Sequence, residues 1–102
     1  QPHPTTMSVS IFDHVPIDGG HHEFALDGTE QAPSASVDLG NAGYLIMQAN
    51  VDYSAKQGAF VTGQTGFSRT ANTDYMVSRS EWSNLRIKAS EAGKLIIQGY
   101  KS

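Results

Sequence analysis

The chain has 102 residues and a net charge of −3, and only 17% of its residues are charged. A chain of this length forms one domain with an ordinary hydrophobic core. It contains no cysteine, which excludes disulfides, zinc–thiolate sites and cysteine nucleophiles. Its seven Lys and Arg residues are scattered singly, so no basic stripe predicts nucleic-acid binding. No apolar run approaches the ~20 residues of a membrane span.

The N-terminal residues 1–6 are rich in Pro, which cannot enter the interior of a sheet. They are predicted to form an arm or a linker ahead of a single domain at residues 7–102. The first strand of that domain is predicted over residues 7–17, where apolar residues first alternate with serines. Pro16 cannot donate a ladder hydrogen bond, so the strand is expected to be an edge or to be bulged there.

A hairpin is predicted next, because Asp18 is followed by two glycines. This turn places Phe24 and Leu26 on the inner side of the returning strand. A loop is expected over residues 27–33, a strand over residues 34–39 and a turn over residues 40–43.

The longest predicted strand covers residues 44–53, and its apolar side chains alternate without interruption. A turn at 54–58, a strand at 59–67 and a polar loop reaching residue 74 are expected to follow. A short strand at 75–79 then leads into a tight connection at 80–84. One helical turn capped by Ser80 is expected in that connection.

The last eighteen residues are predicted to form one hairpin around a loop at 91–93. This register places Ala89 opposite Leu95, with Ile87 opposite Ile97 and Leu85 opposite Gly99. These side chains are expected to face the core.

Strands cut by Gly, Pro, Asn or Asp every eight to twelve residues or so are typical of a sandwich or barrel. The predicted fold is an all-β, antiparallel β-sandwich of about seven or eight short strands, jelly-roll-like, with an immunoglobulin-like arrangement as the alternative. In general character the chain is similar to viral or phage surface domains and to small bacterial lectins, which would place it outside the cell or on a virion surface.

Two strands have an outer side that is unusual because both carry Tyr, Ile and a side-chain amide. A solvated strand needs no Ile or Tyr there, and an apolar patch set among amides is typical of an interface. The two strands are therefore expected to share one sheet and to contact a partner, most simply another copy of the chain. The predicted contact residues are Tyr44, Ile46, Gln48, Ile96, Gln98 and Tyr100.

A second hypothesis is a glycan-binding module in which an exposed Trp82 stacks on a sugar ring. Its hydrogen-bonding rim would consist of Arg79, Asn72, Asp74 and Asn84. The alternative for Trp82 is a plug at one end of the sandwich.

A metal site built from His14, His21 and Glu23 is a third hypothesis, and a polar hairpin end is the simpler interpretation. His21 and His22 are adjacent and therefore point to opposite faces of a strand. No Gly-X-Ser-X-Gly elbow is present, and the alternative is a Ser-His-Asp arrangement assembled in space, which sequence order does not restrict. The leading prediction is therefore a non-enzymatic structural or assembly module without a cofactor, either homo-oligomeric or decorating a larger particle, fibre or filament.

Overall fold

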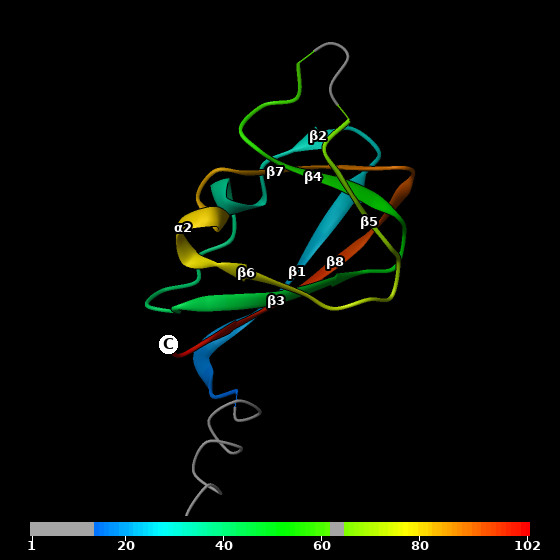
Figure 1. The fold of residues 1–102 in the computed structure, drawn as a ribbon. Coiled ribbons are helices and arrows are strands. Elements are labelled where there is room, and N and C mark those ends of the chain that lie inside the picture. The colour runs from blue at the N-terminus through cyan, green and yellow to red at the C-terminus, as the bar shows by residue number, and fades with distance from the viewer. Residues whose placement is uncertain (1–13, 62–64) are drawn as a thin grey trace, which may run out of the picture.

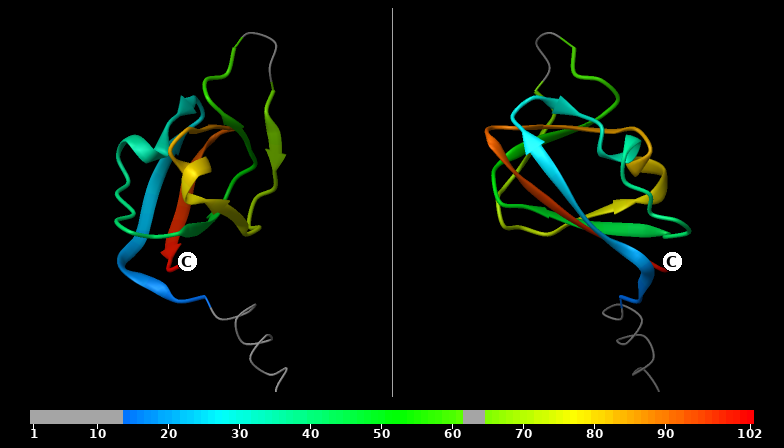
Figure 2. Two further views of the ribbon diagram at one scale, coloured as in Figure 1. Left: turned by 60° about the vertical axis from the view of Figure 1, so that its left-hand side comes forward. Right: turned by 180° about the vertical axis from the view of Figure 1, so that it is seen from behind.

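The chain folds into two antiparallel four-stranded β-sheets packed face to face (Figure 1 and Figure 2). The computed structural model describes residues 14–61 and 65–102. Its strands are β1 (Pro16–Asp27), β2 (Glu30–Gln31), β3 (Tyr44–Ala49), β4 (Tyr53–Gln57), β5 (Phe67–Arg69), β6 (Tyr75–Ser78), β7 (Leu85–Ala89) and β8 (Ala92–Tyr100). Two short helical segments, η1 (Pro33–Ala35) and α2 (Arg79–Trp82), complete the fold. The predicted all-β sandwich is confirmed.

The strand order identifies the sandwich as a jelly roll. One sheet has the order β1-β8-β3-β6 and the other has the order β2-β7-β4-β5. The first half of the chain thus pairs antiparallel with the second half, as β1 with β8, β2 with β7, β3 with β6 and β4 with β5. Among the strands of the described residues, only β4 and β5 are neighbours both in sequence and in a sheet, whereas immunoglobulin-like sheets contain more such pairs.

The predicted pairing of the two C-terminal strands in a hairpin is wrong, but the side chains predicted to face the core do so. β7 pairs with β2 and β4, whereas β8 pairs with β1 and β3, so the connection between them crosses from one sheet to the other. Ile87 and Ile97 are both fully buried, but they approach the core from opposite sheets. The alternation of apolar residues determines which side of a strand faces inward. A short loop can join two strands of the same sheet or two strands of different sheets, so it does not identify the pairing.

The predicted hairpin at Gly19 and Gly20 is also wrong, because β1 continues through both glycines. The register between β1 and β8 shifts between Pro16 and His21, which marks an irregularity of the β-bulge type. Gly19 has a φ of 69°, a conformation that favours glycine and suits a bulge as well as a turn. Leu26 is buried and Phe24 packs against the core, as expected.

The predicted strand over residues 44–53 is two strands, β3 and β4, separated by a bend at residues 50–52 where the chain changes sheets. Residues 54–57, expected in a turn, belong to β4. Most of the region predicted as a strand over 34–39 is η1 and irregular chain, although Val37 and Leu39 are buried. The predicted strand over 59–67 is wrong, because residues 59–61 and 65–66 are irregular and β5 begins only at Phe67, inside the predicted polar loop. Residues 62–64 lie outside the described residues.

The short strand before α2 is confirmed as β6, and the expected helical turn is present. Its cap is Ser78 and not Ser80. The Ser78 side chain accepts a hydrogen bond from the Glu81 backbone N–H, and the Glu81 carboxylate accepts one from the Ser78 backbone N–H. The predicted arm at 1–6 and the first part of the strand predicted at 7–17 lie outside the described residues.

The core fills the space between the sheets. Its most buried side chains alternate along strands of both sheets, and they include Leu45, Met47, Tyr53, Ala55, Val77, Leu85, Ile87, Leu95 and Ile97. Trp82 of α2 belongs to the same cluster. Within residues 14–61 and 65–102, neither helical segment has the length and hydropathy of a membrane-spanning helix.

Candidate functional site

The six predicted contact residues lie together on the outer side of two central strands. β3 and β8 are hydrogen-bonded neighbours, and their pairs are Tyr44 with Tyr100, Ile46 with Gln98 and Gln48 with Ile96. All six are half-buried, and they alternate with fully buried core residues. We call these six residues the β3–β8 face. The expectation that the two strands share one sheet is confirmed, and the role of the face as a contact surface stays a prediction.

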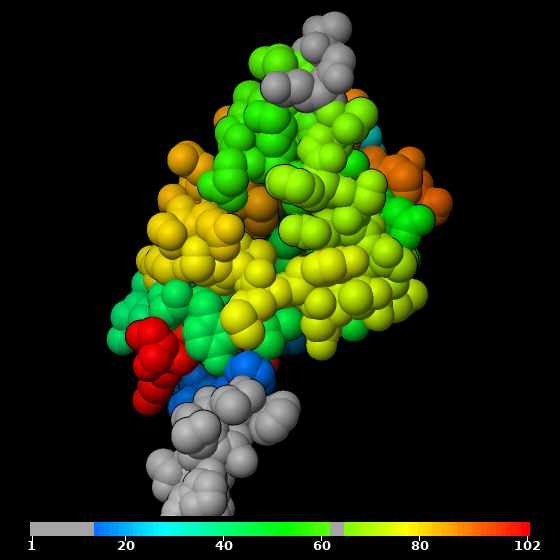
Figure 3. All heavy atoms as spheres, viewed as in Figure 1, coloured from blue at the N-terminus to red at the C-terminus, as the bar shows by residue number. Residues whose placement is uncertain are grey.

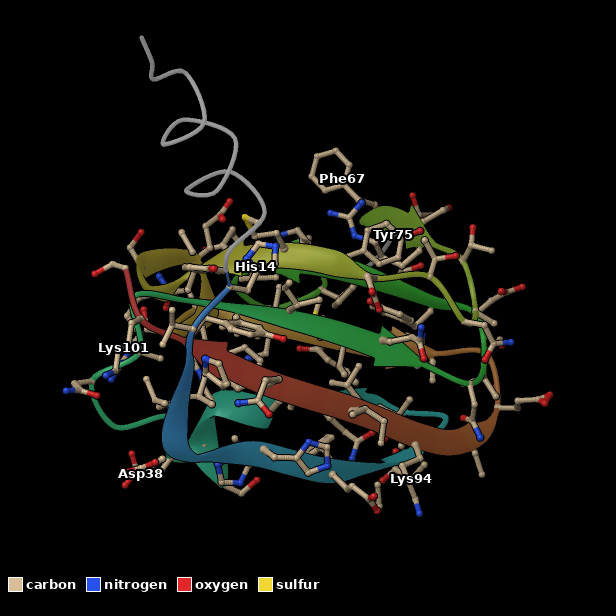
Figure 4. The ribbon with its side chains drawn as sticks, turned by 90° about the horizontal axis from the view of Figure 1, so that it is seen from below. His14, Asp38, Phe67, Tyr75, Lys94 and Lys101 are labelled. Carbon is tan, nitrogen blue, oxygen red and sulfur yellow. The ribbon has the colours of Figure 1, made fainter. Side chains whose placement is uncertain are left out.

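Three aromatic rings pack against one another at one end of the β3–β8 face. The Tyr44 and Tyr100 rings stack with their centroids 5.4 Å apart and their planes 17° apart. The His14 ring contacts both, and its Nδ1 is hydrogen-bonded to the Tyr44 hydroxyl at 2.6 Å. Figure 4 shows the chain before β1 crossing the ends of β8 and β3 to reach His14. The described chain therefore starts beside Tyr44.

The apolar surface continues onto the edge strand β6, and charges lie at its rim. Met76 pairs with Ile46 across β3 and β6 and is 63% exposed. On the opposite edge, Glu23 of β1 forms an ion pair with Lys94 at 3.1 Å. This pair is half-exposed and contributes little to stability. An apolar centre with a charged rim is the composition of protein interfaces.

The five residues of the glycan hypothesis are not brought together. Trp82 is only 3% exposed, so it plugs the sandwich and offers no open ring for stacking. Arg79 donates a hydrogen bond from Nη1 to the Ala42 carbonyl at 2.9 Å, and it lines a hollow of about 400 Å³ with Trp82. Asn72 and Asp74 precede β6, whereas α2 follows it, so the two groups lie at opposite ends of that strand.

The residues of the metal hypothesis serve other contacts. His14 packs on the tyrosines, while Glu23 pairs with Lys94. In the described part of the chain, no group of three His, Cys, Asp or Glu side chains has the arrangement of a metal site. His21 is exposed on the outer side of β1 and His22 is half-buried, which agrees with their predicted opposite orientations.

A second apolar surface, which the sequence analysis missed, lies between the edge strands β5 and β6. Phe67 is 71% exposed and stands clear of the sandwich in Figure 4. The Arg69 guanidinium lies 4.7 Å from the centre of the Tyr75 ring, so the two edges face each other. Between them is a hollow of about 110 Å³, which Phe67 and Met76 line together with core residues such as Met47 and Val77. We call this hollow the β5–β6 slot.

The sequence contains one feature that could have indicated the β5–β6 slot. In β6, Met76 occupies the outer position between Tyr75 and Val77, which predicts an exposed apolar side chain. Its partner across the slot is Phe67, nine residues earlier in the chain and in the other sheet. Local alternation carries no information about that juxtaposition.

Tyr53 is buried next to Tyr75 and is close enough to Arg69 to be affected by its charge. It is 4% exposed, and its ring meets the Tyr75 ring edge-on at 6.4 Å. Within the described residues, no group hydrogen-bonds to its Oη. Burial raises the pKa of Tyr53 to about 12, although the nearby Arg69 charge opposes that rise.

We expect Tyr53→Phe to raise the free energy of unfolding at pH 7 by about 1 kcal/mol, because it removes a buried hydroxyl that lacks a partner. Because the pKa of Tyr53 is raised in the folded state, folding favours the neutral form of the hydroxyl over the ionised form. This preference leaves stability unaffected by pH below 10 and costs stability as the pH rises through about 12. The variant should therefore lose less stability over that range. Urea unfolding at several pH values measures both effects.

Tyr75→Phe is the matched control for this experiment. The Tyr75 hydroxyl accepts a hydrogen bond from the Thr70 backbone N–H at 2.8 Å, and this bond lowers the pKa of Tyr75. Its removal should give no stabilisation. Equal gains in the two variants would show that the Tyr53 hydroxyl is not the cause.

Comparison of the chain with protein-family models, with curated proteins and with solved structures gave no match. The two surfaces described above are therefore the basis on which a function is inferred. Both expose apolar side chains, and the β3–β8 face is the one with aromatic rings, amides and a charged rim in one continuous area.

Proposed function

We propose that the chain is a non-enzymatic assembly module that associates through its β3–β8 face, with further copies of itself or with a larger particle, fibre or filament. The observation that carries this proposal is the outward orientation of Ile46, Ile96 and two stacked tyrosines on adjacent central strands. An ordinary solvated sheet face alternates core residues with polar ones. Here the outer positions of β3 and β8 carry Ile and Tyr side chains beside the two amides.

Physical chemistry favours contact through side chains at this face. β3 and β8 each have a hydrogen-bonded neighbour on both sides, so neither offers a free backbone edge. Because the Ile and Tyr side chains of this face are already half-buried, covering the rest of each contributes on the order of 1 kcal/mol. The amides Gln48 and Gln98 can then hydrogen-bond across the contact without the cost of burying a charge.

A second copy is the partner that this face fits most simply. The two tyrosines lie at one end of the face and the Ile and Gln side chains lie along the rest, so a second copy turned by 180° can place its Ile and Gln side chains against the tyrosines of the first. Such a surface meets itself about a two-fold axis, which is the commonest symmetry of soluble oligomers. The Glu23–Lys94 pair at the rim then offers both signs of charge to the partner's equivalent rim.

Ile96→Glu is expected to remain folded and to have a lower molar mass than the wild-type assembly, in which each chain contributes 11.0 kDa. The substitution places a charge in the middle of the face, where association would have to desolvate it. Ile96 is half-buried on the outer side, so the fold should persist. Light scattering after gel filtration gives the molar mass, and circular dichroism checks the fold.

Ser54→Glu is the matched control, because it adds the same charge at a half-buried outer position of the other sheet. It should leave the molar mass of the wild type unchanged. The proposed face is wrong if Ile96→Glu has the same molar mass as the wild type, or if both variants dissociate alike.

A further inference from the structure

The β5–β6 slot is flanked by two strand edges, and its lining combines apolar side chains with the polar side chains of Lys56, Gln57, Arg69 and Glu81. β5 pairs only with β4, and β6 pairs only with β3, among the described residues. Figure 3 looks onto this side, where a recess separates the side chains of β5 from those of α2 and β6. Exposed strand edges are templates for the addition of another strand. An added strand here would also cover Phe67 and Met76.

The sequence of residues 7–12 has the pattern that such a strand needs. Met7, Val9 and Ile11 alternate with Ser8 and Ser10. In a strand, this pattern gives one apolar side and an opposite side that carries the two serines followed by Phe12. The apolar side matches the slot, and the serines suit the solvent side of the sheet.

We propose that residues 7–12 of one copy dock as an added antiparallel strand on β6 of a second copy, with Met7, Val9 and Ile11 over the β5–β6 slot. Backbone hydrogen bonds to the free edge of β6 supply affinity, and the alternate side chains supply register. This inference specifies how copies are linked, and it uses the edge strand β6, which borders the β3–β8 face but contains none of its six residues.

The position of His14 is the reason for assigning the segment to a second copy. His14 is held by Tyr44, which pairs with Ser78 at the C-terminal end of β6. From there, the chain's own segment would enter β6 at that end and run parallel to it. Every ladder of the described residues is antiparallel, and antiparallel pairing is slightly more stable.

An antiparallel arrangement on the chain's own β6 exceeds its reach. Phe12 would then lie beside Tyr75, three residues or roughly 10 Å along β6 from Ser78. Phe12 is only two residues from His14, so it reaches at most about 7 Å from that residue. A second copy has no such restriction, because its segment can approach β6 from the Tyr75 end.

Engineered cysteines test the docking directly, because the chain has none of its own. In the proposed arrangement, Ser10 and Met76 share the outer side of the extended sheet. A mixture of full-length Ser10→Cys and full-length Met76→Cys chains should form, on mild oxidation, a disulfide that joins positions 10 and 76 of different copies. Mass spectrometry of the linked peptides identifies it.

Glu91→Cys replaces Met76→Cys in the control mixture, since Glu91 is exposed in the connection between β7 and β8. The linked fraction should be several-fold lower there. It should also fall several-fold when Phe67→Ser accompanies Met76→Cys. Equal linking at positions 76 and 91 overturns the proposal. So does a monomer with an internal disulfide in the double variant Ser10→Cys/Met76→Cys, because it shows docking within one chain.

The same experiment in the Ile96→Glu background separates the two proposals. The disulfide between positions 10 and 76 should still form there, because Ile96 does not line the slot. If the disulfide forms but Ile96→Glu does not alter the molar mass, the docked segment stands and the β3–β8 face fails. If the mass falls and no such disulfide forms, the docked segment fails and the face stands.

Discussion

Trp82→Ala is expected to lower the free energy of unfolding by about 3–5 kcal/mol, because it removes a large buried ring and leaves a cavity. Trp82 is 3% exposed and belongs to the core cluster. The capping box of Ser78 and Glu81 fixes α2, which limits how far the helix can move into the space left by the ring. The loss is a large share of the 5–15 kcal/mol that stabilises a typical domain.

Urea unfolding followed by far-ultraviolet circular dichroism measures this loss without using the tryptophan signal. Ser83→Ala is the neighbouring control at an exposed position, and it should cost well under 1 kcal/mol. In the wild type, the emission of Trp82 should be blue-shifted and should not respond to added sugars. A loss below 1 kcal/mol, or a sugar-dependent emission, would show that Trp82 is not the plug described here.

The sequence predicted the inner and outer sides of most strands correctly, because sidedness is a local property. Leu45 and Met47 alternate with outer residues, and so do Leu95 and Ile97, and all four are buried. The period of two requires no knowledge of the partner strand. The β3–β8 face was found in the same way, since outward Ile and Tyr residues are visible in the alternation itself.

Strand partners depend on distant segments, and here local signals failed. Residues 91–93 and the pair Gly19-Gly20 both resemble hairpin turns. In the fold, one lies at a crossing between sheets and the other at an irregularity within β1. In a jelly roll, strands far apart in sequence pair with each other, so a turn seldom identifies the neighbouring strand.

The exposure of individual side chains could not be predicted from the sequence either. Trp82 was compatible with an exposed ring and with a plug, and only the packing of α2 between the sheets decides between them. The β5–β6 slot arises where two edge strands from different sheets face each other. Neither Phe67 nor Met76 alone signals it.

Ile97→Ala is expected to lower the free energy of unfolding by about 2–5 kcal/mol, whereas Ile96→Ala should cost less than about 1 kcal/mol in the monomer. The two residues are adjacent in β8 and have identical side chains. Ile97 is fully buried between Met47 and His22 of the neighbouring strands, whereas Ile96 lies on the outer side. Their comparison therefore isolates the effect of sidedness.

Both variants should be unfolded in urea at a protein concentration low enough to keep each chain monomeric, so that association does not contribute to the measured stability. Under these conditions, Ile96→Ala should leave the stability of folding nearly unaltered, and Ile97→Ala should lower it. At higher protein concentrations, Ile96→Ala should weaken association. Equal losses in the monomer would mean that Ile96 is packed as tightly as Ile97. The β3–β8 face would then belong to the fold of each copy and would not be free to bind a partner.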